Sequence, residues 1–437
     1  MTSTIRPKDR DALLLSLRAG VVPRVGLHLI QVGREGEVRA ALADIERIAD
    51  GGSSIRFVIG EYGSGKTFFL NLVRSIALEK KLVTAHADLT PDRRLQASGG
   101  QARSMYAELM RNISTRAKPD GGAMSSIVER FVTEAWRQAR EQKASPEDVI
   151  HTRLRDMAEM TGGYDFAAVV AAYWRGHDSG KEQLKSDAVR WLRGEFSTRT
   201  EARNALGVRT IIDDASVYDH LKLMACFARH AGFNGMLVFL DELVNLYKLA
   251  NTQARNANYE QILRILNDSL QGFSVGLGFA LGGTPEFLTD TRRGLWSHPA
   301  LQSRLAENTF ATQGLVDYTG PVVRLSGLSQ EDFYVLLAKL RHVFAGGKEA
   351  KYLVTDEGLT AFMEHCSKRI GDAYFRTPRN TVISFINLLS VLEQNPKASL
   401  QELLGGVQVL KDEGPDSSDI PDAEAPARGN DLASFRL

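Results

Sequence analysis

The chain has 437 residues, of which 43% are hydrophobic and 24% are charged, and this composition excludes collagen-like, low-complexity and wholly disordered proteins. Its 54 basic and 53 acidic residues give a net charge of +1, so the chain is no bulk basic coat for DNA, and any nucleic-acid contact must be a local patch. Two cysteines, Cys226 and Cys366, favour a reducing compartment over a disulfide framework. Without an apolar leader or a long apolar run, we expect a cytoplasmic protein with no contact to membranes.

The first hundred residues predict the start of an α/β sheet. Residues 10–50 have helical patterns on both sides of a short turn, and a short β-rich run follows at 55–59. A glycine-rich loop, a helix over 68–73 and a second strand over 82–87 come next. A strand, glycine loop, helix and strand in this order are typical of a nucleotide-binding α/β sheet.

The rest of the chain predicts a helical insertion, further strands and a helical C-terminal part. Residues 96–215 show no convincing strand, whereas 217–231 are helical and strands are expected at 236–240, 275–281 and 322–325. We therefore predict an ATPase core over 1–325 that is interrupted by the mainly helical insertion 96–215. A helical lid domain is expected over 326–412, and a flexible acidic tail with a terminal apolar motif over 413–437.

The strongest functional motif is the glycine-rich loop at residues 60–67, which fits the phosphate-binding pattern between a strand and a helix. Glycines let successive backbone N–H groups surround phosphate oxygens, and the following helix points its positive end at the same place. Lys66 is expected to reach the β- and γ-phosphates, and the Thr67 hydroxyl to bind Mg²⁺. The alternative is a plain glycine turn. The residues expected to bind nucleotide are Gly60, Glu61, Tyr62, Gly63, Ser64, Gly65, Lys66, Thr67 and Phe68.

A second motif is the pair Asp241 and Glu242, directly after the apolar run 236–240. A buried strand that ends in two carboxylates suits a site for a metal ion and a water molecule. Asp241 is expected to hold Mg²⁺, and Glu242 to orient or deprotonate the attacking water as a catalytic residue beside Lys66. The alternative is a solvated strand end.

The spacing between the two motifs supports the predicted insertion. Lys66 and Asp241 are 175 residues apart, whereas two strand–helix units need only about 60–80 residues. The surplus matches the helical segment 96–215.

Three further residues are candidates for catalytic roles. Thr284 follows a predicted strand and can contact the γ-phosphate or the water, although a Gly-Thr-Pro turn explains it equally well. Arg304 ends a helix-like segment, where it is either a surface arginine or a finger that neutralises charge in a neighbouring subunit. Arg379 opens a C-terminal helix and either reaches the nucleotide from the lid or is solvated.

Two other sequence features do not predict a functional site. Residues 325–330 look like a transporter-ATPase signature, but they follow the Asp-Glu strand instead of preceding it. The scattered histidines show no metal-ligand spacing, and the two isolated cysteines predict no zinc site.

Taken together, these motifs resemble those of an AAA+-type P-loop ATPase. The loop 60–70, the preceding 32–34 and the segments 88–92, 191–195 and 432–437 more narrowly resemble the ATP-binding proteins of BREX phage-defence systems, the BrxD family. The resemblance implies a P-loop NTPase fold and an ATPase with ATP and Mg²⁺ as cofactors. It implies as partners a DNA methyltransferase, a phosphatase-like protein and other ATPases. It also assigns sensor, finger and lid roles to Thr284, Arg304 and Arg379.

Two functions remain open from the sequence. The first is a homo-oligomeric ATPase that acts on DNA or on a protein–DNA complex. An arginine patch in the insertion would then contact the DNA phosphates. The simpler alternative is that these arginines form a solvated helix face. The second is a nucleotide-gated assembly switch with slow hydrolysis that recruits partner proteins. A small-molecule kinase fits less well, because the carboxylate pair favours water as the nucleophile. The arginines of the patch are Arg190, Arg193, Arg199, Arg203 and Arg209.

Overall fold

The computed structural model describes residues 5–311, 315–371 and 378–406. Within them, five parallel strands form one sheet in the order β2-β3-β4-β1-β5. The chain is therefore an α/β protein, as the sequence predicted. The predicted tail, 413–437, lies outside the described residues. The strands are β1 (Ser54–Ile59), β2 (Val83–Asp88), β3 (Met236–Asp241), β4 (Leu277–Gly283) and β5 (Val322–Arg324).

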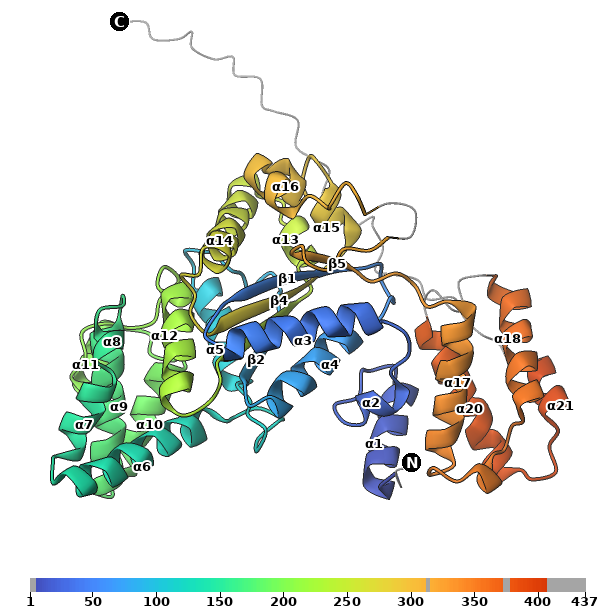
Figure 1. Ribbon diagram of the computed structural model, residues 1–437, viewed down its shortest axis with the longest axis horizontal. Coiled ribbons are helices and arrows are strands. Elements are labelled where there is room, and N and C mark those ends of the chain that lie inside the picture. The colour runs from blue at the N-terminus through green and yellow to red at the C-terminus, as the bar shows by residue number, and fades with distance from the viewer. Residues whose placement is uncertain (1–4, 312–314, 372–377, 407–437) are drawn as a thin grey trace, which may run out of the picture.

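The inner strands β3 and β4 consist mostly of apolar residues and glycine because helices cover both faces of the sheet. All six residues of β3 and all seven of β4 are buried. On one face, α3 (Glu35–Ala49) and α4 (Lys66–Glu79) pack against Val58 and Phe239. Alternate residues such as Phe57 and Val238 face the larger cluster on the other side. That cluster is shared with α12 (Val217–His230) and α14 (Thr252–Leu270), which lie along the sheet in Figure 1.

The segment between β2 and β3 is helical in the described residues, apart from isolated bridges such as Thr84–Ser114. The helices of this segment extend the large buried cluster away from the sheet. Figure 1 shows most of them in green shades to the left of the sheet. Trp191, Phe166 and Phe131 are among the largest fully buried side chains there. The helices are α5 (Gln101–Arg111), α6 (Met124–Gln142), α7 (Pro146–Arg153), α8 (Arg155–Ala158), α9 (Gly163–Asp178), α10 (Glu182–Leu192), α11 (Arg199–Leu206) and α12.

The C-terminal helices form a separate buried cluster together with the N-terminal helices. Leu13 of α1 and Ile30 of α2 are buried in it beside Phe333, Phe362 and Phe385. Figure 1 shows α1 and α2 between the sheet and the C-terminal helices. These elements are α1 (Pro7–Arg18), α2 (Leu27–Ile30), α17 (Gln330–Phe344), η2 (Glu349–Lys351), α18 (Asp356–Ile370), α20 (Pro378–Gln394) and α21 (Leu400–Gly406).

Short helices follow β3 and β4 and complete the described chain. Among all described helices, none is both long and apolar enough to cross a lipid bilayer. The strand expected at 275–281 begins two residues later, at Leu277. Val275 is 58% exposed, and Gly276 has a φ of 66°, so the chain turns there before it enters the sheet. The remaining helices are α13 (Val244–Tyr247), α15 (Pro285–Thr289), η1 (Leu295–Ser297) and α16 (Pro299–Leu305).

Candidate functional site

The predicted phosphate-binding loop joins β1 to the first residue of α4. Gly63 and Gly65 have φ values of 76° and 87°, which L-residues with a side chain rarely adopt. Because α4 begins at Lys66, its unpaired N-terminal amides lie directly after the loop, where they favour an anion. The Ser64 hydroxyl is buried and has no hydrogen-bond partner among the described residues. The loop therefore carries donors that an anionic ligand can use.

The Lys66 ammonium lies inside the loop. Its Nζ donates hydrogen bonds to the carbonyl oxygens of Gly60 (2.7 Å) and Glu61 (2.8 Å). Burial lowers the pKa of Lys66, and the negative charges of Asp241 and Glu242 act in the opposite direction. Within the described part of the chain, the half-buried ammonium donates to these two carbonyls, and it can exchange them for phosphate oxygens without leaving the loop.

The side chains of Thr67 and Asp241 meet at the edge of the sheet. The Thr67 hydroxyl donates to Asp241 Oδ2 at 2.7 Å, and the backbone N–H of Glu242 donates to Oδ1 at 2.9 Å. Asp241 is only 8% exposed. A Cβ on Gly282 would lie 2.2 Å from Asp241 Oδ1, so the neighbouring strand leaves room for this carboxylate only because it has glycine there. A hydroxyl and a carboxylate are the hard oxygen ligands that Mg²⁺ prefers.

Glu242 lies in an unusual backbone conformation beside this pair. Its φ of 59° is in the left-handed region, and non-glycine residues held there cluster at functional sites. Partial burial and the negative charge of Asp241 raise the pKa of Glu242, while Lys66 lowers it. A carboxylate with a raised pKa is better suited to accept a proton than an ordinary glutamate.

Thr284 follows β4 at the same edge of the sheet. Gly283, just before it, pairs in register with Ile59, and its carbonyl accepts a hydrogen bond from Gly60 N (3.2 Å). The Thr284 hydroxyl caps α15 by accepting from Phe287 N (3.4 Å). The structure thus brings Thr284 next to the loop, although its hydroxyl has a local structural partner.

Arg379 reaches the loop from α20. Its Nη1 donates to the Tyr62 hydroxyl at 3.4 Å, and its guanidinium also covers Gly20. Phe68, in the first turn of α4, packs against the cluster of the C-terminal helices. Two of the predicted residues thus connect the loop to those helices.

Arg304 is not brought to the loop of its own chain. It is exposed near the end of α16, and its Nη1 donates to Ala300 O (3.1 Å) within the same helix. Its role as a finger in a neighbouring subunit stays a prediction.

Two further residues, Arg34 and Asp88, lie at the site and were not predicted from the sequence. Arg34 Nη2 donates to the carbonyls of Ser64 (2.8 Å) and Ser326 (2.9 Å), so it joins the loop to the segment before α17. Burial lowers its pKa, while Glu37 raises it. Asp88 pairs in register with Asp241, and its pKa is raised by desolvation and by that neighbour. Asp88 could have been found as a carboxylate at the end of a predicted strand, whereas the carbonyl partners of Arg34 come near it only in the folded chain.

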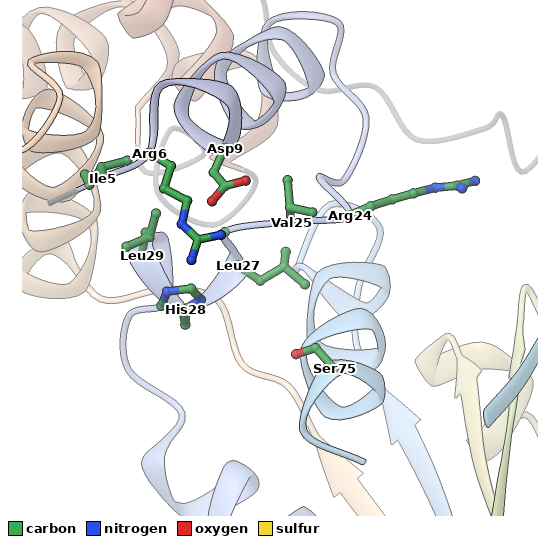
Figure 2. A pocket seen from close by; sticks show the side chains of 10 residues that line it. Ile5, Arg6, Asp9, Arg24, Val25, Leu27, His28, Leu29 and Ser75 are labelled. Atoms are coloured by element: carbon green, nitrogen blue, oxygen red, sulfur yellow. The ribbon is translucent and has the colours of Figure 1, made fainter. Parts of the chain in front are cut away.

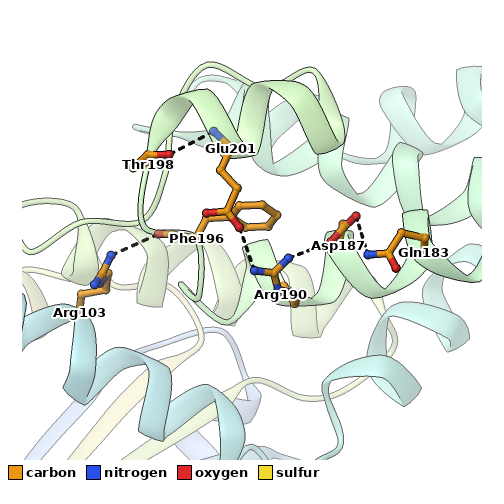
Figure 3. Close-up of polar contacts among 7 residues, drawn as sticks. All are labelled: Arg103, Gln183, Asp187, Arg190, Phe196, Thr198 and Glu201. Carbon is orange, nitrogen blue, oxygen red and sulfur yellow. Dashed lines mark hydrogen bonds and ion pairs between the residues drawn. The ribbon is translucent and has the colours of Figure 1, made fainter.

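The arginines of the insertion are in different surroundings. Arg190 forms ion pairs with Asp187 and Glu201 (both 3.0 Å) and stacks over Phe196 (Figure 3). It is therefore part of the internal structure of the insertion. Arg199, Arg203 and Arg209 are exposed, whereas Arg193 is partly buried.

A cavity of about 440 Å³ lies at another place. It lies between α1, α2 and α4, and Figure 2 shows Arg6, Asp9, His28 and Ser75 around it. None of the residues that line this cavity belongs to the predicted site.

A comparison with protein families gives the identity. The profile of the family described as BREX system ATP-binding protein BrxC/D matches residues 5–408. The chain belongs to this family. No curated protein and no solved structure matches the chain. The family confirms the resemblance seen in the sequence and gives the BREX protein an ATP-binding role in a defence system.

Proposed function

We propose that this BREX protein hydrolyses ATP at the loop 60–67 with the help of Mg²⁺. The observation that carries the proposal is the 2.7 Å contact between Thr67 and Asp241, with Lys66 inside the adjoining loop. Thr67 and Asp241 would hold the ion, which neutralises charge on the transferred phosphoryl group. Lys66 would exchange its carbonyl partners for phosphate oxygens. Glu242 would accept the proton of the attacking water and give it up to solvent afterwards.

The direct test is ATP binding and phosphate release by the purified chain. We expect Mg²⁺-dependent release by the wild type and its loss in Lys66→Ala. Lys80→Ala is the matched control, because Lys80 directly follows the same helix and is exposed. Equal rates for Lys66→Ala and the wild type would refute the proposed site, and ATP binding without hydrolysis would reduce the proposal to nucleotide binding.

We further propose that the active form is a cytoplasmic homo-oligomer. Arg304 is exposed and has no described contact with its own loop, so a neighbouring subunit must receive it if it acts in catalysis. Turnover per molecule should then rise with protein concentration as subunits associate. A constant, slow turnover over a wide concentration range would contradict this part of the proposal.

DNA, or a protein–DNA complex, is the proposed substrate of the oligomer, together with the methyltransferase, phosphatase-like protein and other ATPases as partners. Exposed Arg199, Arg203 and Arg209 leave room for phosphate contacts, although Arg190 is engaged in ion pairs. DNA should stimulate hydrolysis, and the double change Arg199→Glu and Arg203→Glu should remove the stimulation but keep the basal rate. Full stimulation in that variant would exclude this surface.

A nucleotide-gated switch is the second candidate, and one observation favours it. Arg379 contacts Tyr62 and Arg34 contacts Ser326, so the loop is tied both to α20 and to the segment before α17. A nucleotide that displaces either contact would change the position of the C-terminal helices. In a Glu242→Gln variant that binds but does not hydrolyse ATP, hydrogen exchange in α17 and α20 should change on ATP addition. Unchanged exchange would reject the switch.

A further inference from the structure

A second group of polar side chains lies on the helical segment, away from the loop. Cys226 and His230 are one turn apart on α12, and Asp156 comes from α8, which packs beside α12 (Figure 1). Each offers one atom, and these atoms all lie within 4.8 Å of one another. The sequence analysis saw no metal-ligand spacing here, because Asp156 is 70 positions from Cys226 and only the fold brings it close.

The distances among these atoms are close to those of a metal site. His230 Nε2 is 3.0 Å from both oxygens of Asp156, and Cys226 Sγ is 3.9 Å from Oδ2. Zinc bonded to sulfur, nitrogen and oxygen at ordinary lengths in a tetrahedron would separate the ligand atoms by about 3.3–3.6 Å. Small side-chain rotations that move each atom by less than about one ångström would therefore bring all three atoms onto one ion.

The surroundings favour a cation. His230 is the last residue of α12, and the negative end of a helix attracts positive charge. Arg153 Nη2 donates to the His230 carbonyl at 2.8 Å, which holds the backbone of the ligand in place. The Asp156 side chain is 60% exposed, so water can reach the open side of the cluster.

We propose that Asp156, Cys226 and His230 bind a divalent transition-metal ion of the zinc class, with water as the fourth ligand. A sulfur, an imidazole and a carboxylate together suit this class of ion, in contrast to the oxygen ligands of Mg²⁺. Arg229, next to His230, covers Gly51 and Gly276, which precede β1 and β4. The metal site therefore lies toward the amino-terminal edge of the sheet, opposite Asp241, and is independent of the nucleotide site.

The ion would connect α8 to the end of α12, just before β3. Since the ligands come from two helices and the ion binds only the folded chain, it should stabilise this segment in proportion to the logarithm of its concentration above Kd. We expect Zn²⁺ to raise the unfolding temperature of the wild-type chain.

The decisive experiment uses Co²⁺ as a spectroscopic probe on the full chain after treatment with a chelator. One equivalent should produce a thiolate-to-cobalt charge-transfer band, and Zn²⁺ should remove it by displacement. Cys226→Ser should abolish the band, and His230→Gln should weaken binding at least tenfold. Cobalt at Thr67 and Asp241 gives no such band, because those ligands are oxygens.

The matched control is Cys366→Ala, since Cys366 is the other cysteine and is fully buried in the C-terminal cluster. It should keep the band, and circular dichroism should show that all variants are folded. The proposal is overturned if the wild type gives no thiolate band, if Cys226→Ser keeps it, or if Cys366→Ala loses it. A His–Asp hydrogen bond alone predicts the first of these results.

Discussion

The hydroxyl of Thr67 and the carboxylate of Asp241 form a 2.7 Å hydrogen bond although the two residues are 174 positions apart in the chain. The contact follows from the parallel sheet, because β1 and β3 both end at the edge where the loop and the carboxylate lie. It places two side-chain oxygen atoms next to each other at this edge of the sheet.

Asp241→Asn should weaken the Mg²⁺-dependent binding of ATP. The amide keeps the size that Gly282 accommodates but removes the negative charge that the ion requires. ATP at about 100 times its Kd stabilises a folded protein by about 2.7 kcal/mol, so thermal unfolding with and without ATP and Mg²⁺ measures the loss. The exposed Asp50→Asn is the control. An unchanged ATP-induced stabilisation in Asp241→Asn would show that this carboxylate is not a ligand. Its loss in the control would show that the effect is not specific to residue 241.

Glu242→Gln should separate nucleotide binding from hydrolysis. Removing a general base typically lowers kcat by about 10²–10⁴-fold, whereas binding of ATP should remain, since Thr67 and Asp241 are intact. The variant should be at least as stable as the wild type, because it removes the repulsion between neighbouring carboxylates at 241 and 242. Single-turnover kinetics and equilibrium binding check the two effects. A parallel loss of binding would instead point to a structural role.

The same residue predicts the pH dependence of the rate. Glu242 must be deprotonated to accept a proton, and its pKa is raised by burial and by Asp241. As the pH is lowered, Glu242 therefore becomes protonated at a higher pH than an ordinary glutamate, whose pKa is 4.5. The acid limb of kcat should accordingly lie above pH 4.5. In Glu242→Gln this limb should be absent. An acid limb that persists unchanged in the variant would assign it to another group.

Arg34→Ala should weaken ATP binding without removing any predicted ligand. Arg34 holds the Ser64 carbonyl and the Ser326 carbonyl with one nitrogen, so its loss frees the loop to adopt other conformations. We expect an increase in KM of about tenfold, because the corresponding free energy is close to that of one hydrogen bond from a charged donor. Arg39→Ala is the control, because Arg39 is on α3, the helix that directly follows Arg34, is 79% exposed in its side chain and is paired only with Glu35 among the described contacts. Equal effects of both variants would exclude a positioning role.

The parallel α/β sheet and the residues at its strand ends could be predicted from the sequence. The apolar runs indicate the strands, and the short motifs that directly follow them indicate the residues at the strand ends. Lys66, Asp241 and Glu242 meet at the expected edge. Arg34 could not be predicted as part of the site, since its role depends on carbonyl groups that are near it only in the folded chain. The same reason applies to Asp156 and Cys226. Fold-dependent contacts of this kind carry no local sequence signal.

Arg304 gives the sharpest test of the oligomer. If it acts in the site of a neighbour, an Arg304→Ala chain keeps an intact loop but lacks a donated arginine, and a Glu242→Gln chain lacks the base but can donate Arg304. Each alone should be inactive, and their mixture should recover part of the wild-type turnover, because mixed neighbours combine one intact site with one intact arginine. Arg292→Ala, also exposed, should be active alone. A mixture that stays as inactive as its components would show that Arg304 does not act between subunits.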